Sequence, residues 1–200
     1  MYASNLCWQD KTLKKNKQQT EEPRNSEIMK KGLLSEKGVT VSDSGNFETL
    51  TSRGYGTIEN KKLALSFCEA LFLQSKGMLE VVKGKSCKAL DFQELLHQFK
   101  LADENAWVKY LIYRDLRSRG YVVRDGFGLE IDFRVYERGE YGKATATYLI
   151  LGIQEGKPIS VKELARVLRH VQSLKKKLVL AVVNRRGEIV YYTLSKLTIK

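Results

Sequence analysis

The side chains best suited to proton transfer and charge stabilisation lie in the second half of the chain. Tyr136 ends an alternating stretch over residues 129–136, so its hydroxyl should lie on the face opposite the apolar side chains. Lys176 is the middle one of three consecutive lysines. A tyrosine hydroxyl can supply or orient a proton, and a lysine ammonium can stabilise developing negative charge. Histidine is the usual group for proton transfer near neutral pH, but the chain has only His97 and His170.

Each of these residues also has an ordinary structural interpretation. Tyr136 could be an amphipathic tyrosine at the end of a strand, and the three lysines could simply interact with the carboxyl-terminal dipole of a preceding helix. His97 and His170 both fall in segments of helical spacing, where surface or half-buried histidines are common. From the residues alone, these structural interpretations are favoured.

The composition favours a polyanionic partner and a reducing compartment. A formal net charge of +12 suits phosphate binding, because each neutralised phosphate releases counterions, although a basic chain can also serve solubility or an acidic partner protein. Cys7, Cys68 and Cys87 are odd in number and widely spaced, which favours neither a disulfide framework nor a zinc site. No apolar run approaches the ~20 residues that span a bilayer, and no secretory signal is visible. We therefore expect a cytoplasmic protein with no metal and no cofactor.

The first half of the chain predicts a tail followed by a small α+β domain. Residues 1–37 are polar, lysine-rich and without periodicity, which predicts a flexible basic tail. Residues 38–100 should form the domain, with short strands around Val39, Val41 and Phe47. Two further patterns predict helices: Ser66 with Glu69 forms a capping box before an apolar stretch that ends at Gly77, and a second helix starts with Asp91 and Glu94. Residues 78–82 read as a strand between these helices.

Residues 101–200 predict a mixed sheet flanked by helices, so that the whole chain is an α+β protein. A helix should start near Asn105, with Asn105 as its cap, and a second should start with a capping box of Ser160 and Glu163. Val161 is among the residues expected on the inner face of that second helix. The strands are expected at residues 121–124, 129–136, 147–153, 178–183 and 189–194, with the strand at 178–183 buried on both faces.

This half of the chain resembles the catalytic domain of the archaeal tRNA-splicing endonucleases. The resemblance covers residues 107–192 and rests on five stretches: YLIYRDLRSRGYVVRDGFG, DFRVYERG, TYLILG, RHVQSLKKKLVLAVV and RGEIVYY. A less specific stretch, LALSFCEALFL, resembles the amino-terminal domain of the same family. Members of the family cleave RNA with a Tyr, a His and a Lys and without a cofactor, leaving a 2′,3′-cyclic phosphate and a 5′-hydroxyl.

The resemblance places Tyr136 and Lys176 in the catalytic Tyr and Lys positions. The His belongs three residues before Tyr148, where this chain has Thr145, and a threonine hydroxyl cannot act as a base near neutral pH. The resemblance also implies that Arg169 contacts RNA, although a surface ion pair with Glu163 is an alternative. The neighbouring Lys175 and Lys177 are further candidate RNA contacts.

The absent histidine implies a structural subunit, inactive alone, that forms a heterotetramer of two plus two chains with a paralogous catalytic subunit and helps to hold precursor tRNA. Two observations argue against this: the turn at 184–187 is basic where the family's tetramer-forming loop is acidic, and Tyr136, Arg169 and Lys176 are retained. The alternatives are a catalytic subunit whose histidine is replaced or whose proton transfer differs, and a non-cleaving basic RNA-binding module. We also expect the strand at 189–194 to form an interface with a related chain, unless a helix covers its second face, because the adjacent Tyr191 and Tyr192 must point to opposite faces.

Overall fold

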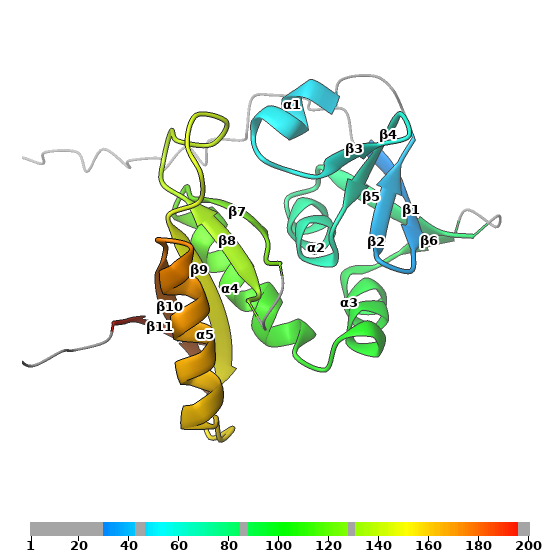
Figure 1. The fold of residues 1–200 in the computed structure, drawn as a ribbon. Coiled ribbons are helices and arrows are strands. Elements are labelled where there is room, and N and C mark those ends of the chain that lie inside the picture. Colours follow the sequence, from blue (N-terminus) through cyan, green and yellow to red (C-terminus); the bar gives the residue numbers. More distant parts are fainter. Residues whose placement is uncertain (1–29, 43–46, 85–87, 128–130, 196–200) are drawn as a thin grey trace, which may run out of the picture.

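The computed structural model describes residues 30–42, 47–84, 88–127 and 131–195, which form two mixed sheets with helices between and beside them (Figure 1). The α+β class expected from the sequence is confirmed. The amino-terminal elements are β1 (Lys30–Ser35), β2 (Gly38–Val41), α1 (Phe47–Ser52), β3 (Thr57–Glu59), β4 (Lys62–Leu65), α2 (Phe67–Ser75), β5 (Leu79–Lys83), β6 (Lys88–Leu90) and α3 (Phe92–Ala102). The carboxyl-terminal elements are α4 (Ala106–Ser118), β7 (Val122–Asp125), β8 (Phe133–Tyr136), β9 (Tyr148–Gln154), α5 (Val161–Ser173), β10 (Lys177–Val183) and β11 (Ile189–Leu194).

The amino-terminal sheet has the strand order β3-β4-β2-β1-β5-β6, in which only β1 and β5 are parallel neighbours. The prediction of a tail over residues 1–37 is therefore wrong for residues 30–35, which form β1 inside the sheet. The strand carries little apolar signal because a glycine, Gly32, occupies a buried position against Val39. Residues 1–29 of the expected tail lie outside the described residues.

Two capped helices cover the inner face of this sheet. The capping boxes predicted for Ser66 with Glu69 and for Asp91 with Glu94 are both present at the starts of α2 and α3, where each carboxylate also accepts from the backbone amide of its cap. The strand predicted at 78–82 is confirmed as β5. Phe47, in contrast, begins the short helix α1 rather than a strand.

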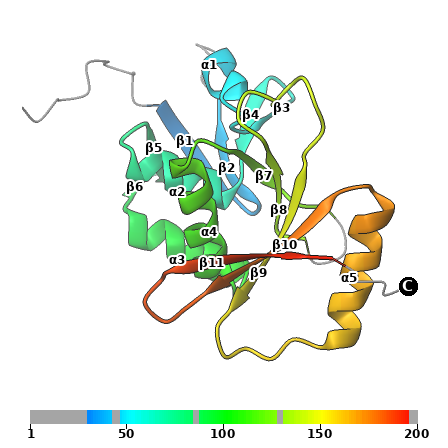
Figure 2. The same ribbon diagram turned by 90° about the vertical axis from the view of Figure 1, so that its left-hand side faces the viewer.

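The carboxyl-terminal sheet has the order β11-β10-β9-β8-β7, and a strand forms in each of the five expected places. The strand expected at 129–136 is shorter than predicted, because residues 131 and 132 lie before β8 rather than in it. The strands β9 and β10 are parallel, and α5 connects them. Helix α4 contacts β7, β9 and β10 on one face of the sheet, whereas α5 contacts β10 on the other (Figures 1 and 2). Most residues of β10 are buried, as expected for a strand between two covered faces.

Three details of these helices differ from the sequence-based expectation. Asn105 makes no side-chain cap bond at the start of α4, because its backbone is not extended (φ −90°, ψ 12°) and its Oδ1 accepts instead from Lys157 Nζ at 3.4 Å. Ser160 makes no side-chain cap bond before α5 either. Val161, the first residue of α5, is 81% exposed rather than inward, so the apolar stripe of this helix begins at Leu164.

The main hydrophobic core runs through both parts of the chain. Buried side chains of the amino-terminal sheet and of α2 and α3 continue through α4 into the facing side of the carboxyl-terminal sheet, so that Leu71, Tyr113 and Phe133 belong to one cluster. A smaller cluster between α5 and the other side of that sheet contains Val167 and Val171. Among the described residues, no helix is long and apolar enough to cross a membrane.

Candidate functional site

A cavity of about 300 Å³ opens on the α5 side of the carboxyl-terminal sheet, at the end where β8 stops and β9 and β10 begin. The side chains of Tyr136, Thr145 and Lys176 all line it. The other lining residues are mostly apolar: Phe127, Arg134, Ala144, Ala146, Leu149 and Leu174. The structure thus brings together three residues that lie up to forty positions apart in the sequence.

Tyr136 reaches this cavity because of the alternation of its strand. Phe133 and Val135 are buried on the α4 side of the sheet, whereas Arg134 and Tyr136 are half-buried on the opposite side. The ring of Tyr136 meets the ring of Tyr141 edge-on, with the ring centroids 5.1 Å apart. Tyr141 belongs to the turn-rich segment after β8, so this contact holds the tyrosine against the segment that carries Thr145.

Lys176 is placed by the tight turn between α5 and β10. Lys175 adopts a left-handed backbone conformation (φ 54°), and the amide of Lys176 donates to the carbonyl of Val171 at 3.1 Å. The next residue, Lys177, already pairs with the other segment, since its amide donates to the carbonyl of Thr147 at 3.1 Å. The side chain of Lys176 then crosses the cavity, and its Nζ donates to Thr145 Oγ1 at 2.5 Å.

Neither histidine of the chain lines this cavity. His97 is exposed on α3, and His170 is half-buried on α5. Near neutral pH the cavity therefore offers a cationic donor, a phenol and a threonine hydroxyl, but no imidazole that could accept a proton. Among the described residues, no group of three or more His, Cys, Asp or Glu side chains is arranged to hold a metal ion.

The three predicted RNA contacts do not converge on the cavity. Arg169 and Lys175 are exposed, on α5 and in the turn after it, and neither lines the cavity. The ion pair between Arg169 and Glu163, which was the alternative to an RNA contact, is not among the ion pairs of the described residues. Lys177 lies over the ring of Tyr148, with its Nζ 5.6 Å from the ring centroid. None of these three cations lines the cavity, and Tyr148, which Lys177 contacts, lines a different cavity on the α4 side of the sheet.

Two residues that the sequence-based interpretation did not single out also line the cavity. Arg134 lies two positions before Tyr136 on the same face of β8, so the alternation of the strand could have identified it. Phe127 follows the turn after β7, where no periodicity indicates its direction. The Arg134 guanidinium lies over the Phe127 ring, 5.0 Å from its centroid, and its Nε donates to the carbonyl of Asp125 at 3.0 Å.

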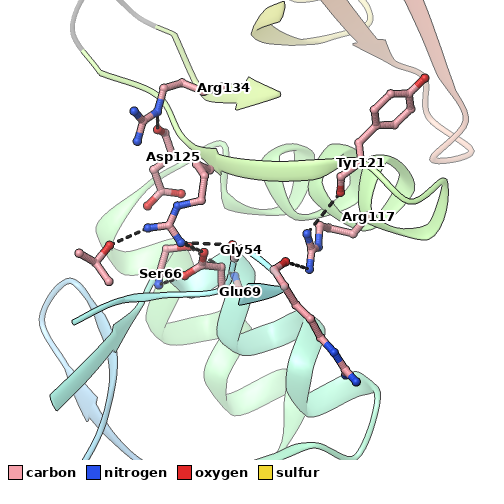
Figure 3. A network of polar contacts seen from close by, with 10 residues as sticks. Gly54, Ser66, Glu69, Arg117, Tyr121, Asp125 and Arg134 are labelled. Atoms are coloured by element: carbon pink, nitrogen blue, oxygen red, sulfur yellow. Dashed lines mark hydrogen bonds and ion pairs between the residues drawn. The ribbon is translucent and has the colours of Figure 1, made fainter. Parts of the chain in front are cut away.

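The hairpin that carries Arg134 and Tyr136 is fixed to the amino-terminal part of the chain by the partly buried Arg124 (Figure 3). Arg124, on β7, donates to Glu69 Oε1 at 2.8 Å, to Thr57 Oγ1 at 2.6 Å and to the carbonyl of Gly54 at 3.3 Å. Burial raises the pKa of Glu69 to about 7, although the Arg124 guanidinium opposes this shift. On α4, Arg117 stacks over the Tyr55 ring at 3.9 Å from the centroid.

Comparison with known proteins agrees with this division of the chain. Residues 30–96 match the family model of the tRNA intron endonuclease N-terminal domain, and residues 106–191 match that of the tRNA intron endonuclease catalytic C-terminal domain. The chain is 34% identical over 164 residues to the tRNA-splicing endonuclease of Methanococcus vannielii, an alignment that covers 82% of this chain and 92% of that protein. It is 36% identical over 141 residues to the tRNA-splicing endonuclease of Pyrococcus furiosus, covering 70% and 80% of the two chains.

Proposed function

We propose, from the premise that this chain belongs to the tRNA intron endonuclease family, that it is a structural subunit of a tRNA-splicing endonuclease. In this role it helps to hold precursor tRNA but does not itself cut it. The observation that carries the proposal is the hydrogen bond from Lys176 to Thr145 in a cavity that also holds Tyr136 and contains no imidazole.

The chemistry of intron removal explains why the missing imidazole matters. Cleavage that leaves a cyclic phosphate needs a base for the 2′-hydroxyl, an acid for the departing 5′-oxygen, and stabilisation of the charge on phosphorus. Lys176 can supply the last of these, and Tyr136 can orient or donate a proton. Thr145 can only donate or accept a hydrogen bond, since its hydroxyl does not ionise near neutral pH. The cavity is therefore suited to hold a phosphate and lacks the base.

The retained pair of Tyr136 and Lys176 in one cavity favours a second candidate function. In this alternative the chain is a catalytic subunit whose proton transfer runs through a group other than the family histidine. The two candidates differ in one measurable property, because only the second predicts that the isolated chain cuts precursor tRNA.

Cleavage assays on the full chain test the proposal. The wild-type chain should leave an intron-containing precursor tRNA intact between about pH 5 and 9 with a chelator present, and Thr145→His should gain cleavage because it places an imidazole beside Lys176. The control is Ala144→His, which adds the same group one position away. Efficient cutting by the wild-type chain would refute the structural role and establish the second candidate.

The proposal also includes a paralogous catalytic partner and a heterotetramer of two plus two chains. The edge strand β11 supports this assembly, because the face of the strand that points away from α4 carries two exposed side chains, Val190 (50% exposed) and Tyr192 (53% exposed). The other face is covered by this chain's own helix α4, because the Tyr191 hydroxyl donates to Asp115 Oδ2 at 2.7 Å. If a mixture of this chain and its paralogue cleaves precursor tRNA while this chain alone does not, the third interpretation, an RNA-binding module with no part in splicing, is excluded.

A further inference from the structure

We propose that Phe127 and Arg134 form a nucleobase-binding subsite beside Tyr136 and Lys176. This subsite takes one base of the RNA strand next to the phosphate that lies at Lys176. The inference rests on the proposed function, because it assumes that the cavity receives RNA, and it adds a specific contact to that function.

The first support is the unusual exposure of Phe127. Its side chain is 54% exposed at the rim of the cavity, whereas Phe133 of the same hairpin is 2% exposed in the core. An exposed aromatic ring at a cationic cavity is a common platform for nucleic acid, because every base has a face that can stack on it. The apolar side chains of Leu149 and Leu174 line the same cavity. A base bound there would therefore have apolar surface removed from contact with water.

The second support is the way in which Arg134 is held. Its Nε bond to the Asp125 carbonyl and its contact with the Phe127 ring fix the plane of the guanidinium at the cavity. Among the described residues, its two Nη atoms have no hydrogen-bond partner. A planar cation held in this way, with Nη donors that no described residue occupies, can stack on a base and also bind the phosphate that follows it.

The geometry connects this subsite to the candidate catalytic positions. Arg134 and Tyr136 are two residues apart on one face of β8, and Lys176 lines the same cavity from the start of β10. A nucleotide whose phosphate lies at Lys176 can therefore place its base on Phe127 without leaving the cavity. Phe127 and Arg134 would then fix the register of the RNA strand relative to Tyr136.

Fluorescent precursor tRNAs test the subsite by a readout that does not depend on cleavage. A set of such RNAs carries 2-aminopurine at one nucleotide at a time around the exon–intron junction, and stacking quenches its fluorescence. With the full wild-type chain we expect quenching at one of these positions. Phe127→Leu should abolish it and weaken binding by roughly 5- to 150-fold, the usual range for one base stacked on an aromatic side chain.

Matched variants separate stacking from charge and from folding. Phe127→Trp should keep the quenching, and Arg134→Lys should keep the charge but lose the planar contact. Trp107→Leu removes another exposed aromatic, 42% exposed on α4 and not part of the cavity lining, and should change nothing. Thermal melting checks that each variant is folded.

The outcomes distinguish failure of the nucleobase subsite from failure of the proposed function. If the wild-type chain binds the junction RNA and Phe127→Leu binds it equally well with unchanged fluorescence, the subsite is refuted and the proposed function stands. If Phe127→Leu disrupts assembly with a protein partner instead of RNA binding, the exposed ring is a protein contact and the subsite is again refuted. If the wild-type chain binds no precursor tRNA, the proposed function fails and the subsite fails with it.

Discussion

Replacing Arg124 with methionine should remove the main polar connection between the two parts of the chain. The aliphatic part of the side chain is kept, so the change mainly deletes the guanidinium. This guanidinium is 14% exposed and binds Glu69, whose side chain is 5% exposed, together with Thr57 and the Gly54 carbonyl. The variant therefore leaves the buried Glu69 carboxylate and the carbonyl of the buried Gly54 without this donor, whereas the exposed Thr57 hydroxyl can bind water instead.

The expected cost depends on pH because of Glu69. Above pH 7 its carboxylate is ionised, and removing the partner of a buried charge costs about 3–5 kcal/mol. At pH 5 the carboxyl is largely protonated, since its pKa is about 7, and the cost is limited to lost hydrogen bonds of about 1 kcal/mol each. Because the pKa of Glu69 is higher in the folded than in the unfolded chain, this group stabilises the fold at pH values below its unfolded pKa of 4.5. This contribution is lost as the pH rises through the folded pKa of about 7. Arg124→Met should raise the pKa further and so deepen the loss at pH 8.

Denaturant titrations and thermal melting at pH 5 and pH 8 measure these differences in stability. At pH 8 the melting temperature of Arg124→Met should fall by about 6–20 °C, since 1 kcal/mol shifts a chain of this size by about 2–4 °C. The double variant Glu69→Gln/Arg124→Met should recover part of the loss at pH 8 and none at pH 5. Arg119→Met is the matched control, because Arg119 is 54% exposed in an ion pair with Asp115 and should cost about 0.5 kcal/mol. A cost below about 1 kcal/mol for Arg124→Met at pH 8, or an equal cost at both pH values, would refute this reasoning.

Further predictions concern the net charge, the edge strand β11 and two glycines. Affinity for precursor tRNA should fall at least about tenfold between roughly 50 and 200 mM salt, because a +12 chain releases counterions when it binds RNA. An affinity that does not change with salt would show that the positive charge does not contribute to RNA binding. Tyr192→Glu and Val190→Glu should weaken association with the catalytic paralogue, as measured by light scattering. Unchanged assembly would show that β11 is not part of the interface. Gly54→Ala should destabilise by more than about 1 kcal/mol in denaturant titrations, because its Cβ would overlap the Val122 side chain. Gly77→Ala should cost less, since it has a similar left-handed backbone but open space, and equal costs would contradict the steric argument.

The elements that the sequence predicted well are those that carry a local signal. The alternation in β8 gave the direction of Tyr136, and the caps of α2 and α3 were visible as short motifs. The strand β1 was missed because one of its inward positions is held by Gly32, so that only Leu34 packs an apolar side chain against the core, and Leu33 between them is 47% exposed. A strand with a hydrogen atom in place of one inner side chain has little apolar alternation to detect.

The candidate site was predictable only in part. The positions of Tyr136, Thr145 and Lys176 came from resemblance to a family, and no local pattern in the residues predicts that they share a cavity. Arg124 looks in the sequence like any surface cation at the end of a strand, and its partial burial follows from the tertiary ion pair with Glu69 on α2. Phe127 could not be assigned either, because it lies in a connection with no periodicity.

The continuous core through α4 has a consequence for synthesis of the chain on the ribosome. Helices α2 and α3 are made before α4, yet both pack against it, and Ile112 and Tyr113 are fully buried there. A nascent chain that ends near residue 100 therefore exposes the apolar sides of both helices to solvent. Such surfaces promote aggregation of incomplete chains. We expect the emerging amino-terminal half to bind chaperones until α4 leaves the exit tunnel, and the first half expressed alone to be insoluble.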